Sequence, residues 1–412
     1  MRILKKNLSL LLIIVFIELF YYQSFAKGTE YVWSNNAEKL IETSANLSNN
    51  KDIPNSLNLE SGAGILIEQK TGQILYEHNI HEKLRPASVT KIMSILLIME
   101  EIEQGRLSYD TQISCSETAA GMGGSQIWLN TTETLSVNDM LKAICVVSAN
   151  DCVVAMAEHI AGSQEAFVEK MNNKAKELGM NDTTFKNCHG IDEDGHETSS
   201  YDIALMSREL LNKYPEITKY TTIWMDSLRD GKSELVNTNK LVRNYKGATG
   251  LKTGSTSLAL YNLSASATRE DLSLIAVIMK APTTKVRFAE AQKLLDYGFN
   301  NFSYHKLGNK GDVIKEINVS KGNREKINGI LEENSGTLIK KGNEKGIEQN
   351  LNLEKSINAP IKKGDKIGEI TYNLDGNIIR SVNVVSDRDV EKLNIFTMGK
   401  RIYYSWINLL RS

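Results

Sequence analysis

The sequence has almost no net charge, since 49 Lys and Arg residues balance 50 Asp and Glu residues over 412 positions. Proteins that bind nucleic acid displace phosphate counterions with a surplus of basic side chains. No such surplus exists here, so a nucleic-acid partner is not expected. Hydrophobic residues make up 41% and charged residues 24%, which is usual for globular proteins, and the length suggests two or three domains.

Cysteine is also scarce, with four residues at Cys115, Cys145, Cys152 and Cys188. None has the CxxC spacing of a zinc or redox site, and a disulfide framework is not expected in a chain of this length. Cys188 lies near His189 and His196, and these residue types are good zinc ligands. The chain has no HExxH motif, however, and its six histidines are scattered.

A long uninterrupted hydrophobic run is missing too. The N-terminus combines a basic "MRILKKN", an apolar "LSLLLIIVFIELF" and a small-residue "SFA" that ends at Ala26. Glu18 shortens the apolar run below the ~20 residues that span a bilayer. We therefore predict a cleaved signal peptide at residues 1–26 and an exported protein, with an uncleaved membrane anchor as the alternative.

The remaining chain divides by pattern. Residues 27–55 are predicted to be a leader or linker, and residues 56–300 the main domain. Within that domain, "GAGILIEQKTGQILYEHN" predicts a β-hairpin, residues 100–215 are mostly helical, residues 245–280 return to strands, and a helix ends near Phe299.

The sequence pattern changes after this helix. Residues 305–388 alternate in short strands separated by Gly, Asn and Lys turns, which predicts a small β domain. Residues 390–412 carry apolar side chains near one helical face with basic residues among them. This pattern favours an amphipathic helix at a membrane surface. A terminal helix docked on the β domain is the alternative.

The stretch "RPASVTKIMSILLIMEEIEQG" places Lys91 in the first turn of an apolar helix, three residues after Ser88. That spacing puts both side chains on one face. Apolar surroundings disfavour the ammonium form, and a neutral amine can take the proton of the serine hydroxyl. An N-cap serine followed by a snorkelling surface lysine is the structural alternative.

Two further motifs follow in order. "SAN", from Ser148 to Asn150, lies at a break in an apolar helical stretch, and "KTG", from Lys252 to Gly254, lies on a predicted strand. The ordered set SxxK, SxN and KTG is typical of penicillin-recognising serine enzymes. Copies of "SAN" at 44–46 and of "KTG" at 70–72 precede Ser88 and are therefore out of order.

The segments around these motifs carry a wider likeness. "LRPASVTKIMS", "GMGGSQIWL", "SANDCVVAMAEHIAGS", "MNDTTFKNCHGIDEDGH" and "NTNKLVRNYKGATGLKTGSTS" resemble the D-alanyl-D-alanine carboxypeptidases among the low-molecular-mass penicillin-binding proteins. The resemblance implies an α/β (α+β) DD-peptidase/β-lactamase-like catalytic domain, in which helices flank an antiparallel sheet beside a helical lobe. A small all-β domain and a C-terminal amphipathic helix would follow.

The resemblance also implies roles for individual residues. Ser88 would be the nucleophile and Lys91 its general base. Ser148 would relay a proton to the leaving amine, and Asn150 would hold Lys91 and the substrate amide. The backbone N–H groups of Ser88 and Ser255 would form the oxyanion hole.

The carboxylate end of the substrate would meet the third motif. The resemblance places Lys252 and Thr253 at the substrate carboxylate, with Gly254 and Ser255 beside them, and matches Arg287 to an arginine near that pocket. The charge of Lys252 would further depress the pKa of Lys91.

Three departures from the family pattern bear on substrate preference. Ala259 and Leu260 stand where relatives carry a small Ala-Gly pair, and Cys152 stands where alanine is expected. "CHGIDEDGH" lacks the usual Leu-Pro after His-Gly.

The sequence therefore predicts a membrane-associated serine D-Ala-D-Ala carboxypeptidase on the outer face of the cytoplasmic membrane or in the cell wall, without cofactor or metal. Its partners would be peptidoglycan stem peptides ending in D-Ala-D-Ala and β-lactam antibiotics, which would acylate Ser88. A class A β-lactamase is disfavoured, because its ExxLN pattern occurs only at 348–352, after the KTG motif. A DD-endopeptidase with the same residues and a non-catalytic peptidoglycan-binding protein remain alternatives.

Overall fold

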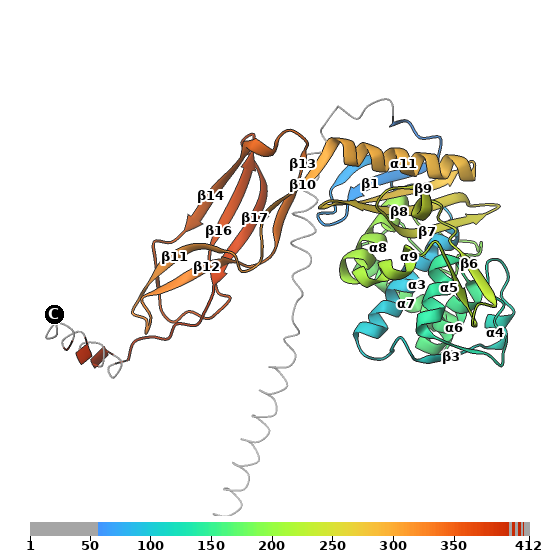
Figure 1. Cartoon of the computed structure of the whole chain (residues 1–412), viewed down its shortest axis with the longest axis horizontal. Coiled ribbons are helices and arrows are strands. Elements are labelled where there is room, and N and C mark those ends of the chain that lie inside the picture. Colours follow the sequence, from blue (N-terminus) through green and yellow to red (C-terminus); the bar gives the residue numbers. More distant parts are fainter. Residues whose placement is uncertain (1–56, 395–397, 400–402, 405–406, 408–412) are drawn as a thin grey trace, which may run out of the picture. The chain divides into compact units, whose positions relative to one another are not determined.

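The computed structural model describes residues 57–394, 398–399, 403–404 and 407 (Figure 1). The predicted signal peptide and leader, and most of the predicted C-terminal helix, lie outside these residues. Where residues 390–394 are described, Val390 and Lys392 form isolated β-bridges with Ile361 and Gly322, so a helix does not begin at residue 390. Within the described part of the chain, no helix has the length and hydropathy needed to cross a membrane.

A five-stranded antiparallel sheet forms the centre of the first domain, in the order β2-β1-β9-β8-β7. Its strands are β1 (Ala63–Glu68), β2 (Ile74–His78), β7 (Ala248–Thr256), β8 (Leu260–Arg269) and β9 (Leu272–Ala281). The predicted hairpin and the predicted strands are thus confirmed. The pairing of β1 with β9 joins segments from the two ends of the domain.

Both faces of the sheet are buried, and β9 shows how. Ile275, Val277 and Met279 belong to the core cluster shared with the helical lobe. Alternate residues of the same strand, such as Leu274 and Ala276, pack in a second cluster with α11 (Thr284–Asn301). Successive strand side chains point to opposite faces, so a continuous apolar strand fills two cores.

Helices cover the two faces of this sheet (Figure 1). Helix α11 lies along one face, and the other carries the helical lobe. The longer helices of the lobe are α3 (Lys91–Glu103), α5 (Val137–Val146), α6 (Asn150–Ala161), α7 (Gln164–Glu177) and α8 (Ser200–Lys213). Shorter elements are η2 (Ala87–Thr90), α4 (Glu117–Ala120), η3 (Pro215–Ile217), α9 (Thr218–Thr221), α10 (Leu241–Asn244), and the hairpins β3 (Gln112–Ser114) with β4 (Thr134–Ser136) and β5 (Met225–Leu228) with β6 (Ser233–Val236).

Hydroxyl N-caps fix where several helices begin. The side chains of Ser136, Ser163 and Ser199 each accept a hydrogen bond from the backbone N–H three residues later, at the starts of α5, α7 and α8. Thr283 does the same for α11. Each cap satisfies an N–H group that the first helical turn leaves without a partner, and typically stabilises by about 1 kcal/mol.

The remaining strands form an all-β domain with a separate core. Ile317, Ile327, Tyr372 and Val384 are among its buried residues. One sheet pairs β10 (Phe302–Gly308) with β13 (Ser335–Lys340), and the other has the order β14-β16-β17-β12-β11-β15. Its strands are β14 (Ile347–Leu353), β16 (Lys366–Leu374), β17 (Asn377–Ser386), β12 (Lys326–Leu331), β11 (Val313–Ser320) and β15 (Ser356–Asn358). The predicted domain order, an α/β domain followed by an all-β domain, is confirmed.

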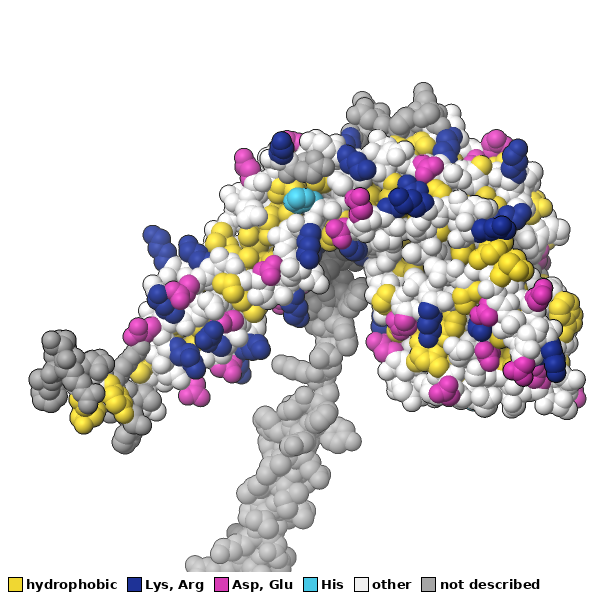
Figure 2. Space-filling model, in the orientation of Figure 1, with side chains coloured by type: hydrophobic (Ala, Val, Ile, Leu, Met, Phe, Trp, Pro, Cys, Tyr) yellow, Lys and Arg dark blue, Asp and Glu magenta, His cyan; other side chains and the backbone are white. Residues whose placement is uncertain are grey.

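On the face that Figure 2 shows, Lys and Arg side chains are interspersed with Asp and Glu side chains. This distribution agrees with the near-zero net charge of the sequence.

Candidate active site

Ser88 lies in the short 3-10 turn η2, and the α-helix begins only at Lys91. The sequence pattern predicted Lys91 in the first turn of the helix, and Lys91 is its first residue. The i to i+3 relation still holds, and Lys91 Nζ lies 2.9 Å from Ser88 Oγ. Lys91 is completely buried, which excludes the reading as a snorkelling surface lysine.

Lys91 Nζ makes two further hydrogen bonds, one to Asn150 Oδ1 at 2.6 Å and one to the backbone carbonyl of His189 at 2.7 Å. Both oxygens can only accept, so the amine donates to each. The Asn150 orientation is fixed by its Nδ2, which donates to the Gly123 carbonyl at 2.7 Å. A neutral amine has two N–H bonds, so its lone pair then faces the Ser88 hydroxyl.

The electrostatic surroundings favour that neutral amine. Burial, and after it the positive charge of Lys252, hold the pKa of Lys91 well below its usual value. The effect of Lys252 on Lys91 is the one expected from the sequence. The cluster can therefore move a proton from Ser88 to Lys91, which makes the serine oxygen nucleophilic.

The break predicted at the SAN motif lies between α5 and α6: Ser148 is in it, and Asn150 is the first residue of α6. Ser148 is 3% exposed and has a φ of +66°, an uncommon conformation for a side-chain-bearing residue. Its Oγ is buried and has no hydrogen-bond partner among the residues that the structure describes. Backbone strain and an unpaired buried hydroxyl at one position are typical of functional sites.

The KTG motif lies on β7 against the turn that carries Ser88. A Cβ added to Gly254 would lie 2.8 Å from Ser88 N and 2.9 Å from Pro86 O, so only glycine allows this approach. Lys252 is buried and its Nζ donates to the carbonyl of Thr253 at 3.0 Å. Ser255, which follows Gly254, is exposed near the end of β7.

The hydroxyl of Thr253 donates to Thr238 Oγ1 at 2.7 Å, which holds its side chain in one orientation. Arg287 lies on α11 behind the same strand. Its Nη1 donates to the carbonyls of Gly254 at 3.3 Å and Asn262 at 3.2 Å. Sequence reasoning placed Arg287 near the carboxylate pocket, and the structure shows it bonded to the backbone of the motif itself.

The contribution of residues 186–190 was missed by sequence reasoning. The imidazole of His196 bridges this loop and the nucleophile turn: its Nδ1 accepts from Lys186 N at 3.0 Å, and its Nε2 lies 2.8 Å from Thr90 Oγ1. Burial lowers the pKa of His196 to about 4, so the neutral ring donates to Thr90. The loop thereby presents the His189 carbonyl to Lys91.

Gly190 is the sequence feature that could have indicated how closely this loop approaches the turn that carries Ser88. Its φ is +92°, and a Cβ there would lie 1.9 Å from the carbonyl oxygen of Ala87. Glycine is the residue that tolerates both the conformation and the contact.

The fold and the three motifs define this protein as a member of the serine acyl-transfer class that carries SxxK, SxN and KTG. A family model described as D-alanyl-D-alanine carboxypeptidase matches residues 49–283. A second model, described as the C-terminal domain of penicillin-binding protein 5, matches residues 302–392. The chain belongs to the D-alanyl-D-alanine carboxypeptidase family.

Comparisons with individual proteins support the same family assignment. The chain is 42% identical over 351 residues to D-alanyl-D-alanine carboxypeptidase DacF of Bacillus subtilis, covering 84% of this chain and 90% of that protein. It is similar in structure to penicillin-binding protein 5 of Haemophilus influenzae, with a TM-score of 0.72, 32% identity, and coverage of 81% and 98% of the two chains. The ampicillin-bound penicillin-binding protein D2 of Listeria monocytogenes matches with a TM-score of 0.55 and 30% identity, over 59% of this chain and 99% of that one.

Loss of the proton from Lys252 should lower the activity of the enzyme at high pH. Burial lowers its pKa to about 7, and only its ammonium form can bind a carboxylate. We expect kcat/KM for a peptide with a free C-terminus to fall as pH rises above about 7, and kcat to fall at higher pH, because a bound carboxylate raises the lysine pKa.

The measurement is the pH profile of both parameters for wild type and Lys252→Arg. The arginine stays charged, so its kcat/KM should not show this decline. A wild-type kcat/KM that stays level up to about pH 9 would contradict the assignment.

Proposed function

We propose that this chain is a serine-type D-Ala-D-Ala carboxypeptidase that removes the terminal D-alanine from peptidoglycan pentapeptides. The observation that carries the proposal is the buried Lys91 amine, which lies within hydrogen-bond distance of Ser88 Oγ, Asn150 Oδ1 and the His189 carbonyl. In its neutral form it donates to the last two and turns its lone pair to Ser88. Membership of the D-alanyl-D-alanine carboxypeptidase family and the DacF relative support the substrate class.

Acylation would proceed from this geometry. Lys91 takes the Ser88 proton while Ser88 Oγ attacks the carbonyl carbon of the penultimate D-alanine. The backbone N–H groups of Ser88 and Ser255 bind the developing oxyanion, a contribution of about 3 kcal/mol per donor in other acyl-transfer enzymes. The C–N bond then breaks, Ser148 relays the proton to the leaving amine, and D-alanine departs from a Ser88 ester.

Deacylation would use the same groups. Water gives a proton to the neutral base and attacks the ester carbonyl, and the Ser88 oxygen leaves and regains its proton. These steps balance without a cofactor or metal. The free stem peptide ends in the remaining D-alanine.

The rest of the motif residues would orient the substrate. Lys252 binds the terminal carboxylate, and the Thr253 hydroxyl turns its proton from Thr238 to the same carboxylate. Gly254 permits the close approach of β7 to Ser88. Asn150 Nδ2 faces the amide that precedes the penultimate residue. Arg287 supports the strand through the Gly254 carbonyl and adds positive charge behind the carboxylate.

β-Lactams would acylate Ser88 through the same attack on a strained amide. The ampicillin-bound Listeria monocytogenes relative supports this part of the proposal.

Release of D-alanine from a peptide ending in Lys-D-Ala-D-Ala tests the proposal. We expect release by the wild type and none after pretreatment with penicillin, with one penicillin bound covalently per chain by mass spectrometry. Release that persists in a fully penicillin-labelled sample would contradict the acyl-enzyme mechanism. A folded protein that binds penicillin but releases no D-alanine would contradict the substrate.

The family acts on the cell wall, outside the cytoplasm. We propose in addition that residues 1–26 direct export and that residues 390–412 hold the enzyme at the outer face of the cytoplasmic membrane. The support is the basic-then-apolar N-terminus and the apolar residues among basic ones at the C-terminus. Equal membrane recovery of the full chain and of a chain ending at residue 394, which keeps the bridges of Val390 and Lys392, would contradict the second part.

A further inference from the structure

Trp128 is a large apolar side chain that the fold exposes. It is 76% exposed, and its φ of +55° lies in the left-handed region. A bulky residue is a genuine outlier in that region, because its Cβ crowds the backbone. The indole gains little packing energy in return, so neither local propensity nor burial accounts for this conformation.

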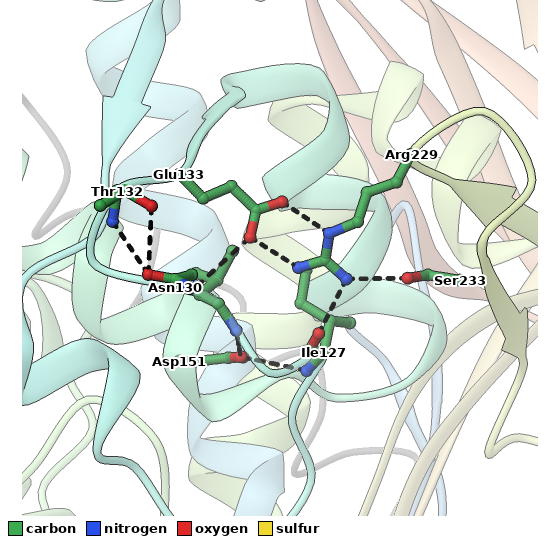
Figure 3. A network of polar contacts seen from close by, with 8 residues as sticks. Ile127, Asn130, Thr132, Glu133, Asp151, Arg229 and Ser233 are labelled. Carbon is green, nitrogen blue, oxygen red and sulfur yellow. Dashed lines mark hydrogen bonds and ion pairs between the residues drawn. The ribbon is translucent and has the colours of Figure 1, made fainter.

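A buried carboxylate holds both sides of the tryptophan. The N–H group of Ile127, which precedes it, donates to Asp151 Oδ2 at 3.1 Å (Figure 3). The N–H group of Leu129, which follows it, donates to the same oxygen at 3.0 Å. Asp151 is fully buried in the first turn of α6, directly after Asn150. The same element therefore positions the catalytic amide and the backbone of Trp128.

An arginine clamps the segment from the other side. Nη1 of Arg229 donates to the carbonyl of Ile127 at 2.9 Å and to Ser233 Oγ at 2.8 Å (Figure 3). Its Nη2 donates to Glu133 Oε2 at 2.9 Å, and its Nε to the second oxygen of the same carboxylate. A two-point Arg–carboxylate contact fixes orientation as well as distance. The segment that carries Trp128 is thus held rigidly before any ligand arrives.

The residues just before the clamped segment contact Asn150, the residue proposed to hold the substrate amide. The Ser125 carbonyl accepts from Asn150 N at 2.7 Å, and the Gly123 carbonyl accepts from Asn150 Nδ2. Trp128 follows Ser125 by three residues, a reach of at most about 10 Å. One peptide residue with a long side chain covers that distance, whereas the sugars of the glycan lie several residues further along the stem.

We propose that the indole of Trp128 is a binding surface for the side chain of the residue that precedes D-Ala-D-Ala in the stem peptide, and that it selects a long basic side chain there. The aliphatic part of such a side chain packs on the indole, and its ammonium lies over the ring face. This specificity role rests on the proposed carboxypeptidase function and deepens it.

The test compares acetyl-Lys-D-Ala-D-Ala with acetyl-Gly-D-Ala-D-Ala, since these peptides differ only in the side chain that the indole would bind. We expect Trp128→Ala to lower the ratio of the two kcat/KM values about fivefold to tenfold, mainly through KM for the lysine peptide, which corresponds to roughly 1 to 1.4 kcal/mol of binding. Trp128→Phe should retain most of the ratio. Met225→Ala, which truncates another exposed apolar side chain of the domain, should leave the ratio unchanged.

Trp128→Gly separates binding from folding. Glycine adopts the left-handed conformation without strain, so the Tm should be at least that of Trp128→Ala, while the ratio should fall as far. Equal ratios in wild type, Trp128→Ala and Trp128→Gly would overturn the specificity role. So would a loss of equal size for both peptides, which would indicate displacement of Asn150. No D-alanine from either peptide with the wild type would instead overturn the carboxypeptidase function.

Discussion

Replacing Ser88 by alanine should lower D-alanine release by at least about 10⁴-fold and abolish covalent penicillin binding, as loss of the nucleophile does in other serine acyl-transfer enzymes. Alanine cannot form the ester, and a water molecule in place of the hydroxyl would not be fixed by a covalent bond to the chain. The fold should persist, because the substitution keeps the Cβ of a half-buried side chain and removes a single oxygen atom. The measurements are initial rates of D-alanine release and mass spectrometry after penicillin treatment.

The chain offers a matched control for this substitution. Ser303 and Lys306 repeat the SxxK spacing on β10. On a strand, side chains three residues apart point to opposite faces, so this pair cannot form the base and nucleophile contact. Ser303→Ala should therefore keep wild-type rates. A Ser88→Ala enzyme that still forms a penicillin adduct would show that the nucleophile is elsewhere.

Replacing Lys91 by methionine should slow acylation of Ser88 by about 10² to 10⁴-fold, the usual contribution of a general base. Methionine keeps most of the side-chain volume but leaves the Ser88 hydroxyl without a proton acceptor. It also leaves the Asn150 Oδ1 and His189 carbonyl oxygens without their donor, and each unsatisfied buried group costs about 1 to 3 kcal/mol. Part of that loss is offset, because a buried amine no longer has to be desolvated.

Stopped-flow acylation by penicillin, together with the Tm, separates the two effects of this substitution. The variant should fold, acylate slowly, and form the same final adduct on Ser88. Lys306→Met, at the exposed second copy of the spacing, should change neither quantity. A Lys91→Met enzyme that acylates at the wild-type rate would show that another group takes the serine proton.

Local sequence patterns determined a large part of this protein. The two-residue period of residues 62–79 predicted the hairpin β1–β2, and the interruption at Ser148 predicted the break between α5 and α6. The spacing of Ser88 and Lys91 placed their side chains together even though Ser88 lies in a 3-10 turn, because i and i+3 share a face in both kinds of helix. Each of these features depends on residues that are close in the chain.

Other features depend on contacts between distant segments, and the tertiary structure alone decided them. The antiparallel pairing of β1 with β9 brings the two ends of the domain together and completes the sheet. The β7 strand approaches the Ser88 turn closely enough to require Gly254, and it places the charge of Lys252 where it lowers the pKa of Lys91. Motif order indicated that these groups belong together, but no local pattern contains their distances.

The sequence by itself predicted which side chains would carry the proposed chemistry and which elements hold them, because side-chain type and hydrophobic period are local properties. The tertiary structure decided that the His189 carbonyl completes the contacts of Lys91, and that Asp151 and Arg229 hold the backbone around the exposed Trp128. These are contacts of backbone groups or of single charged side chains with residues far away in the chain. Such groups have no periodicity of their own, so their positions follow only from the packing of the whole domain.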